Sequence, residues 1–210
     1  MARQRATSTA HVVAAAAEVF ETKGYHKATI DDICEAAGIS RPTVYKYIES
    51  KPWLLEQMVA AVTEELSDKV RAVLDGDGPA GDKLRLLVRL HIESATSKRL
   101  YYATVMSEVS ELSDEARRAY RDWSRGVTHD FTQLTEQYLA ERGIQPRMET
   151  AILSNLMLTM LTSLYRWYDP AGSTPPDRLT EQVLVILSGA LPGVESDASE
   201  ERTIGVPSSR

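Results

Sequence analysis

Cysteine is almost absent from this sequence, since Cys34 is the single one in 210 residues. One cysteine cannot form an intrachain disulfide, and the sequence has neither a CxxC pair nor clustered Cys and His residues at zinc-ligand spacing. We therefore expect a protein of the reducing cytoplasm, with no bound metal and no cofactor.

The sequence also lacks a hydrophobic run that could cross a membrane. Its longest charge-free stretch, residues 150–165, is interrupted by Ser, Thr and Asn and falls short of the roughly 20 apolar residues that span a bilayer. Near the N-terminus, the apolar run at residues 12–17 is short, rich in alanine and followed by Glu18, unlike the hydrophobic region of a signal peptide. These absences predict a soluble chain that is not exported and has no membrane partner.

Catalytic signatures and strand patterns are missing as well. The sequence contains no GxSxG, P-loop or dinucleotide-binding fingerprint, so we do not expect an enzyme. Apolar residues recur at helical spacing throughout the chain, and no segment shows the alternation of a half-buried strand. The fold is therefore expected to be all-α.

Positive charge is scarce, and it is unevenly distributed. The formal net charge is -6. Residues 1–53 hold seven Lys and Arg against six Asp and Glu, whereas the remainder holds 17 against 24. The first quarter, at +1, is the part that can approach a phosphate backbone without strong repulsion.

Capping residues and glycines divide the chain into expected helices. Thr29 and Ser40 are suited to cap helix starts, and Gly24, Gly38 and Gly143 are suited to end helices. The expected helices span about residues 9–23, 29–37, 40–48, 50–74, 83–97, 101–112, 113–142, 148–168 and 179–191.

The segment 29–51 predicts a helix, a tight Gly-containing turn and a second helix, which is helix-turn-helix geometry. Its apolar residues are expected to face inward: Ile30, Ile33, Ala37, Ile39, Val44 and Ile48. With those turned inward, Pro42 and Lys46 fall at the centre of the outer face. This centre is flanked by Thr43, Tyr45 and Tyr47, and Arg41 begins the helix. Thr29 caps the preceding helix, and Lys51 starts the next one. Together with Pro42 and Lys46, these six residues are the expected DNA contacts.

Five short runs follow one another at set distances along the chain: Ala14 to Tyr25, Thr29 to Ile33, Ala36 to Ser40, Thr43 to Ile48, and Ser50-Lys51. Together they resemble the DNA-binding domain of the TetR family of transcriptional regulators over roughly residues 9–60. The resemblance implies a homodimer, usually a repressor, with operator DNA as partner and a larger C-terminal helical domain that binds a small-molecule effector. Pro42 stands where the family often has Gly, and Ile48 where it often has Phe.

The domains are expected at residues 1–53 for DNA binding, 54–191 for effector binding and dimerisation, and 192–210 as a disordered tail. The fragment Tyr165 to Gly172 resembles the end of TetR-type regulators of fatty-acid and sterol catabolism, which implies an acyl-CoA thioester as effector. An alternative is an all-α carrier or enzyme for acyl ligands whose N-terminal helices only pack.

Effector-binding residues are expected between the central helices and near the end of the penultimate one, because pockets of helical bundles lie between helices. The candidates are His91, Tyr102, Met106, Trp123 and Trp167. The phosphates of the effector are expected near a group of cations: Lys98, Arg99, Arg117, Arg118, Arg121 and Arg125. An equally weighted alternative is that these side chains only keep exposed helix faces in contact with water. His91 is also compatible with a purely structural role.

The last two helices carry more apolar surface than one chain can cover, so they are expected to pair with a second copy. Leu184 is expected on the outward apolar side. Asp31 and Asp32 are expected to serve the helix dipole rather than acid–base chemistry, and Cys34 to be a small buried hydrophobe.

Overall fold

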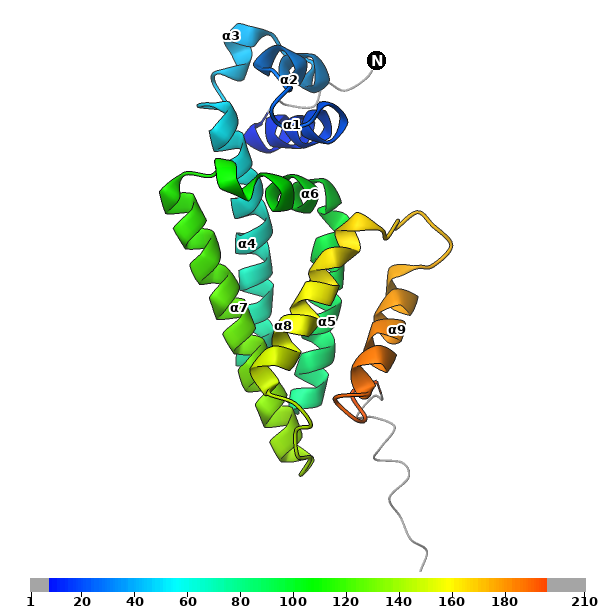
Figure 1. Cartoon of the computed structure of the whole chain (residues 1–210). Coiled ribbons are helices and arrows are strands. Elements are labelled where there is room, and N and C mark those ends of the chain that lie inside the picture. Colours follow the sequence, from blue (N-terminus) through cyan, green and yellow to red (C-terminus); the bar gives the residue numbers. More distant parts are fainter. Residues whose placement is uncertain (1–7, 196–210) are drawn as a thin grey trace, which may run out of the picture. The chain divides into compact units, whose positions relative to one another are not determined.

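The computed structural model describes residues 8–195, and it confirms an all-α architecture, with no strand in that range. The helices are α1 (Thr9–Lys23), α2 (Ile30–Ala37), α3 (Arg41–Val44), α4 (Lys51–Asp75), α5 (Ala80–Ser97), α6 (Arg99–Glu108), α7 (Asp114–Glu141), α8 (Thr150–Thr162) and α9 (Pro176–Ser188), with 3₁₀ turns η1 (Val109–Glu111) and η2 (Ser163–Arg166) (Figure 1). None of these helices is both long and apolar enough to cross a membrane.

The chain divides into two compact units. Unit 1 contains the described residues up to 65 and residues 98–122; unit 2 contains residues 66–97 and 123 onward. Helices α4 and α7 therefore contribute to both units. Residues of α6 and of the start of α7 share the core of the N-terminal helices, and the expected domain boundary at residue 53 stays a prediction.

Unit 1 is built around one apolar core. Its buried members come from α1, α2, α3, α4 and α6, and include Val12, Phe20, Ile33, Val44, Leu54 and Val105. An ion pair of 2.7 Å between Arg99 and Glu21 also joins α6 to α1. Helices from the two sequence segments thus bury a shared face, and α6 packs on the core of the three-helix helix-turn-helix.

The third helix is shorter than expected. α3 ends at Val44, and the chain continues as a hydrogen-bonded turn in which the N–H groups of Lys46 and Tyr47 donate to the carbonyls three residues earlier. Such i to i+3 bonds tighten the backbone beyond α-helical geometry. Val44 and Ile48 are nevertheless both buried, as their spacing predicted.

In unit 2, α5 packs against α8, η2 and α9. The expected helix 148–168 is α-helical only to Thr162 and then tightens into the 3₁₀ turn η2. The expected tail begins with residues that pack: Val194 is buried, and the Tyr138 hydroxyl donates to the Pro192 carbonyl at 2.7 Å. The rest of that tail, residues 196–210, lies outside the described residues.

Candidate DNA-binding surface and effector region

The exposed side of α3 and its following turn carries the residues expected to read DNA. Arg41, Pro42, Tyr45 and Lys46 are exposed, whereas Val44 between them is fully buried. We call these four exposed residues the recognition face. Tyr45 is 51% exposed although it is a large aromatic side chain. A guanidinium, an ammonium, a phenol hydroxyl and a small apolar ring together suit phosphates, base acceptors and thymine methyl groups.

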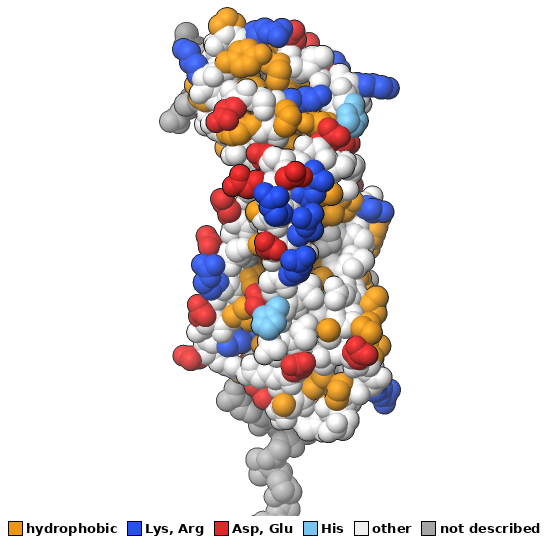
Figure 2. All heavy atoms as spheres, turned by 60° about the vertical axis from the view of Figure 1, so that its left-hand side comes forward, with side chains coloured by type: hydrophobic (Ala, Val, Ile, Leu, Met, Phe, Trp, Pro, Cys, Tyr) orange, Lys and Arg blue, Asp and Glu red, His pale blue; other side chains and the backbone are white. Residues whose placement is uncertain are grey.

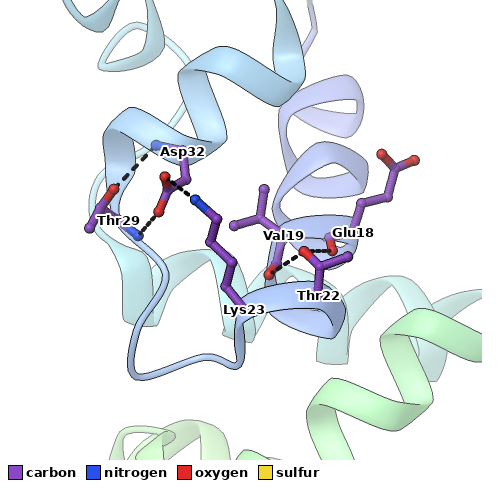
Figure 3. Close-up of polar contacts among 6 residues, drawn as sticks. All are labelled: Glu18, Val19, Thr22, Lys23, Thr29 and Asp32. Atoms are coloured by element: carbon purple, nitrogen blue, oxygen red, sulfur yellow. Dashed lines mark hydrogen bonds and ion pairs between the residues drawn. The ribbon is translucent and has the colours of Figure 1, made fainter.

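The start of α2 is fixed by a reciprocal cap. The Thr29 hydroxyl accepts from the Asp32 N–H at 3.2 Å, and the Asp32 carboxylate accepts from the Thr29 N–H at 3.0 Å (Figure 3). Lys23 from α1 donates to the same carboxylate at 2.6 Å. The hydrogen bond from Lys23, followed by those from Thr29, lowers the pKa of Asp32 to about 2. The cap fixes the start of α2, and the ion pair ties that start to Lys23 of α1.

The turn between α2 and α3 depends on Gly38. Its φ of 66° and ψ of 33° are left-handed, and its N–H donates to carbonyls in the last turn of α2. Cys34 in that last turn is buried, and burial raises the pKa of its thiol. The thiol thus behaves as a small apolar group, as expected.

Arg41 and Ser40 make local contacts at the start of α3. The Arg41 guanidinium contacts both carboxylate oxygens of Asp31 at 2.7 and 2.9 Å, with both side chains largely exposed. The Ser40 and Thr43 hydroxyls lie 2.8 Å apart, and Ser40 makes no side-chain bond to the helix backbone. An exposed ion pair contributes little to stability, so Arg41 can exchange Asp31 for a phosphate at small cost.

Lys51 does not project from the surface as its place in the sequence suggested. Its ammonium donates to the backbone carbonyls of Tyr25 at 2.7 Å and Ala28 at 3.1 Å, with His26 at 3.4 Å, and lies 4.5 Å from the Tyr25 ring centroid. An ammonium has three donors, and all three have acceptors within the chain. These contacts give Lys51 a structural role in closing the loop after α1, and the phosphate contact expected at Lys51 stays a prediction. Tyr47 is half-buried against the core of unit 1.

Family comparisons agree with this geometry. Residues 12–58 match the model of bacterial regulatory proteins of the tetR family, and residues 77–191 match the Tetracyclin repressor-like C-terminal domain. The second match alone spans more than half of the chain. The chain belongs to the TetR family of transcriptional regulators.

Individual relatives share only a modest part of the sequence of this chain. The transcriptional repressor KstR2 of Mycobacterium tuberculosis H37Rv is 20% identical over 177 residues, covering 84% of this chain and 88% of the relative. KstR2 of Rhodococcus jostii is 23% identical over 179 residues, covering 83% and 86%. Both relatives are named as helix-turn-helix repressors of transcription, a class of protein that is not enzymatic.

Two solved structures share the fold of this TetR-family chain. The ketosteroid transcriptional regulator KstR2 of Mycobacterium tuberculosis superposes with a TM-score of 0.80 at 19% identity, covering 89% of this chain and 95% of that one. AibR in complex with isovaleryl coenzyme A and operator DNA gives 0.72 at 16% identity, covering 88% and 98%. At these identities the likeness establishes the fold.

The five expected effector residues fall in different places. Tyr102, buried, and Met106, half-buried, belong to unit 1, where the Tyr120 hydroxyl lies 3.8 Å from the Met106 sulfur. His91, Trp123 and Trp167 belong to unit 2. They do not gather there: the Trp123 indole donates to Ser67 at 2.8 Å, and Trp167 is 66% exposed and so does not line a closed cavity of this chain.

His91 is the buried one of the three expected effector residues in unit 2. The residue is 5% exposed, and its ring meets the Phe131 ring of α7 edge-on, with centroids 4.9 Å apart. Burial lowers its pKa to about 4, against the weaker opposite effect of its bond to the Leu87 carbonyl. Neither Phe131 nor Thr135, another fully buried residue of α7, was among the expected residues. Their spacing of four residues was the available signal for a shared helix face.

Cations lie along the outer side of α7. Arg118, Arg121 and Arg125 are exposed and recur at intervals of three and four residues, and Figure 2, which turns the α7 side forward, shows Lys and Arg side chains gathered with acidic ones among them. Three of the six expected cations have the following ion pairs: Lys98 pairs with Glu65 at 2.6 Å, Arg99 with Glu21 at 2.7 Å, and Arg117 with Asp114 at 3.5 Å.

The last two helices expose large apolar side chains. Ile152 and Leu156 of α8 and Val185 and Ile186 of α9 are at least half exposed, and Ile186 reaches 66%. Leu184, in contrast, is 7% exposed, so its expected outward orientation is wrong. α9 packs on α5 and buries Leu184 and Leu187, whereas Val185 and Ile186 lie on the exposed side of the same turn.

Proposed function

We propose that this TetR-family regulator is a repressor that binds a palindromic operator as a homodimer and is released from it by an acyl-CoA thioester. The observation that carries the DNA-binding half is the recognition face, in which polar and cationic side chains are exposed around a buried Val44. In a helix-turn-helix, the second helix enters the major groove with such a face.

On that face, Lys46 and Pro42 are proposed to contact base edges, and Arg41 and Tyr45 to contact phosphates. Thr29, Thr43 and half-buried Tyr47 are proposed to add hydroxyl contacts to the backbone of the DNA. Base contacts discriminate between sequences, whereas phosphate contacts fix position and add salt dependence. Lys51 is left out of this set, because its ammonium is occupied by carbonyls of unit 1.

The effector half rests on three supports. The fragment Tyr165 to Gly172 resembles the end of TetR-type regulators of fatty-acid and sterol catabolism. Among proteins of similar fold, KstR2 is described as a ketosteroid regulator, and AibR was solved with isovaleryl coenzyme A. Finally, the exposed arginines Arg118, Arg121 and Arg125 offer charge for the phosphates of a CoA moiety.

Release follows from linkage. An effector that binds better to a conformation with wrongly spaced recognition helices weakens DNA binding by the same factor by which DNA weakens effector binding. The dimer is proposed to form through α8 and α9, whose exposed apolar side chains would then be buried.

The test is a titration of the full-length protein on its own upstream DNA. Fluorescence anisotropy at fixed salt gives the affinity of a palindromic fragment and of a scrambled fragment, followed by acyl-CoA thioesters of increasing chain length. We expect specific binding that a thioester reverses and free CoA does not. Loss of binding in Lys46→Ala with unchanged helix content supports the recognition face, and equal affinity for the scrambled fragment refutes an operator-specific regulator. Release by an uncharged lipophile but by no thioester refutes the acyl-CoA assignment alone.

A further inference from the structure

Two buried polar atoms in the described part of unit 2 lack a hydrogen-bond partner: Nε2 of His91 on α5 and Oγ1 of Thr135 on α7. Both residues lie in the interior, Thr135 with no exposed surface and His91 with 5%. Proteins leave few buried polar groups unsatisfied, because such a group has lost its bonds to water without replacement. In the described part of unit 2, these two atoms are the buried side-chain groups that a bound molecule or a water can satisfy.

The chemistry required at His91 follows from its other nitrogen. Nδ1 lies 2.8 Å from the Leu87 carbonyl oxygen, which can only accept, so Nδ1 carries the ring proton. Because burial lowers the pKa of His91 to about 4, the ring is neutral near pH 7. A neutral ring protonated at Nδ1 presents a lone pair at Nε2. The missing partner at Nε2 is therefore a hydrogen-bond donor.

Thr135 is unusual among the helical threonines. A helical threonine hydroxyl can donate to the carbonyl four residues earlier, and this bond satisfies it without any external group. Several described threonines make that bond: Thr96 to Ile92, Thr104 to Leu100, Thr128 to Ser124, Thr132 to Thr128, and Thr180 to Pro176. Thr135 does not, although it is the most deeply buried of them.

The two atoms belong to one apolar seam. The His91 ring packs edge-on against Phe131, and Phe131 precedes Thr135 by one helical turn, so both lie on the same face of α7. Phe131 and Leu87 are fully buried there. Among these four residues, the polar groups are one acceptor on α5, Nε2 of His91, and one hydroxyl on α7, that of Thr135.

We propose that the α5–α7 seam is a subsite of the effector, and that it selects an apolar group bearing a hydroxyl, whose proton is donated to Nε2 of His91. A ketone or carboxylate has no proton to donate, so either can accept from Thr135 and still leave His91 unsatisfied. The subsite deepens the proposed function, on which it rests for the premise that unit 2 binds an effector. If the effector is an acyl-CoA thioester, the subsite favours one whose acyl group carries a hydroxyl.

The test uses three small probes of similar size on the full-length protein: cyclohexanol, cyclohexanone and methylcyclohexane. Affinities come from NMR titration, with the ¹⁵N shift of the His91 ring as a direct reporter at Nε2. We expect cyclohexanol to bind about tenfold more tightly than either other probe and to move the Nε2 resonance, as one added hydrogen bond allows. Equal affinities for the three probes, or an unmoved Nε2 signal at saturation, overturn the proposal.

Variants separate recognition from folding. His91→Phe should bring the alcohol to within about twofold of the hydrocarbon. Thr135→Val should leave the Tm of the ligand-free protein unchanged or raised, because it removes an unsatisfied hydroxyl at nearly constant shape, and should weaken cyclohexanol binding. Thr96→Val is the matched control: it loses the 2.8 Å bond to Ile92, so it should lower the Tm and keep the preference for the alcohol.

A drop in Tm in Thr135→Val as large as in Thr96→Val would mean that the hydroxyl is satisfied internally, and the subsite would be wrong. So would a bound water that bridges to Nε2 and persists when cyclohexanol is saturating. If His91→Phe does not fold, the proposal is tested by the three probes on the wild-type protein and by the comparison of Thr135→Val with Thr96→Val. No probe contains CoA, so failure of thioesters to release the operator and failure of the alcohol preference are separate results.

Discussion

At the start of α4, Lys51 illustrates how one cation can serve the fold rather than a ligand. Its ammonium bonds to carbonyls of the loop after α1 and lies over the Tyr25 ring. We expect Lys51→Ala to lower the free energy of unfolding by about 1 to 3 kcal/mol, since hydrogen bonds to charged groups are stronger than neutral ones. Urea denaturation followed by circular dichroism measures this change.

Lys46 should behave in the opposite way. Its side chain is exposed on the recognition face, so Lys46→Ala should leave the urea midpoint unchanged and weaken operator binding by about 1 to 3 kcal/mol if it contacts a base. For both variants, operator affinity is also measured at several salt concentrations, which gives the slope of log affinity against log salt. A salt slope that falls by about one in Lys51→Ala, with unchanged stability, would restore Lys51 as a phosphate contact.

Asp32 gives a prediction about pH. Its pKa is lowered to about 2 in the folded protein by Lys23 and then Thr29, below the ordinary value near 4. A depressed folded-state pKa adds stability above the unfolded pKa, and this stability is lost as the pH falls from about 4 towards 2. Asp32→Asn should therefore lower the urea midpoint at pH 7 and flatten its fall between pH 4 and 2. Because the carboxylate is solvent-accessible, the change should be modest, and parallel pH profiles for both proteins would contradict it.

At the scale of elements, the sequence predicts most helices because local signals define them. The helix 9–23 ends at Gly24 as expected, and the α2 cap at Thr29 and Asp32 uses residues three apart. The end of α3 was missed, because the choice between α-helical and tighter bonds after Val44 involves the packing of Ile48 and Tyr47 on the unit 1 core. Tertiary contacts overrule local propensity there.

The same contrast holds for the candidate sites. Periodicity from buried Val44 correctly placed Arg41, Pro42, Tyr45 and Lys46 on the exposed side. Periodicity does not tell which apolar positions of α9 meet α5, so Leu184 was assigned outward, and the acceptors of Lys51 lie more than 20 residues earlier. Long-range partners of this kind have no local sequence signal.

Gly38 links α2 to α3, and its conformation suits glycine best. Its φ of 66° is left-handed, and an added Cβ would meet no neighbouring atom, so a substitution is limited by backbone strain alone. We expect Gly38→Ala to lower the free energy of unfolding by about 1 to 2 kcal/mol, and Gly38→Asn to lower it less, because Asn tolerates this region. Thermal unfolding of the three proteins measures the order. A Gly38→Ala protein as stable as wild type would show that the turn relaxes into another conformation.

On the scale of the whole molecule, we expect the exposed apolar surface of α8 and α9 to be covered by a second copy of the chain. Ile152, Leu156, Val185 and Ile186 lie outward on the two last helices of unit 2, and none is covered within the described chain. A two-fold axis lets the same surface cover itself, which closes the assembly at two copies. The proposed dimer would carry two recognition faces, as binding to a palindromic operator with half-sites about 34 to 36 Å apart requires.

Ile186→Asp tests that dimer. Since Ile186 is 66% exposed, an Asp there should not disturb the monomer's own core, but burying its charge in a dimer is costly. We expect monomers of normal helix content in sedimentation velocity, and a large loss of operator affinity, because one half-site contact no longer tethers the second. Leu184→Asp is the contrast: at a 7% exposed position it should lower helix content itself. An Ile186→Asp protein that sediments as a dimer moves the interface away from α9, whereas a monomer that still binds the full operator with wild-type affinity removes the need for two recognition faces.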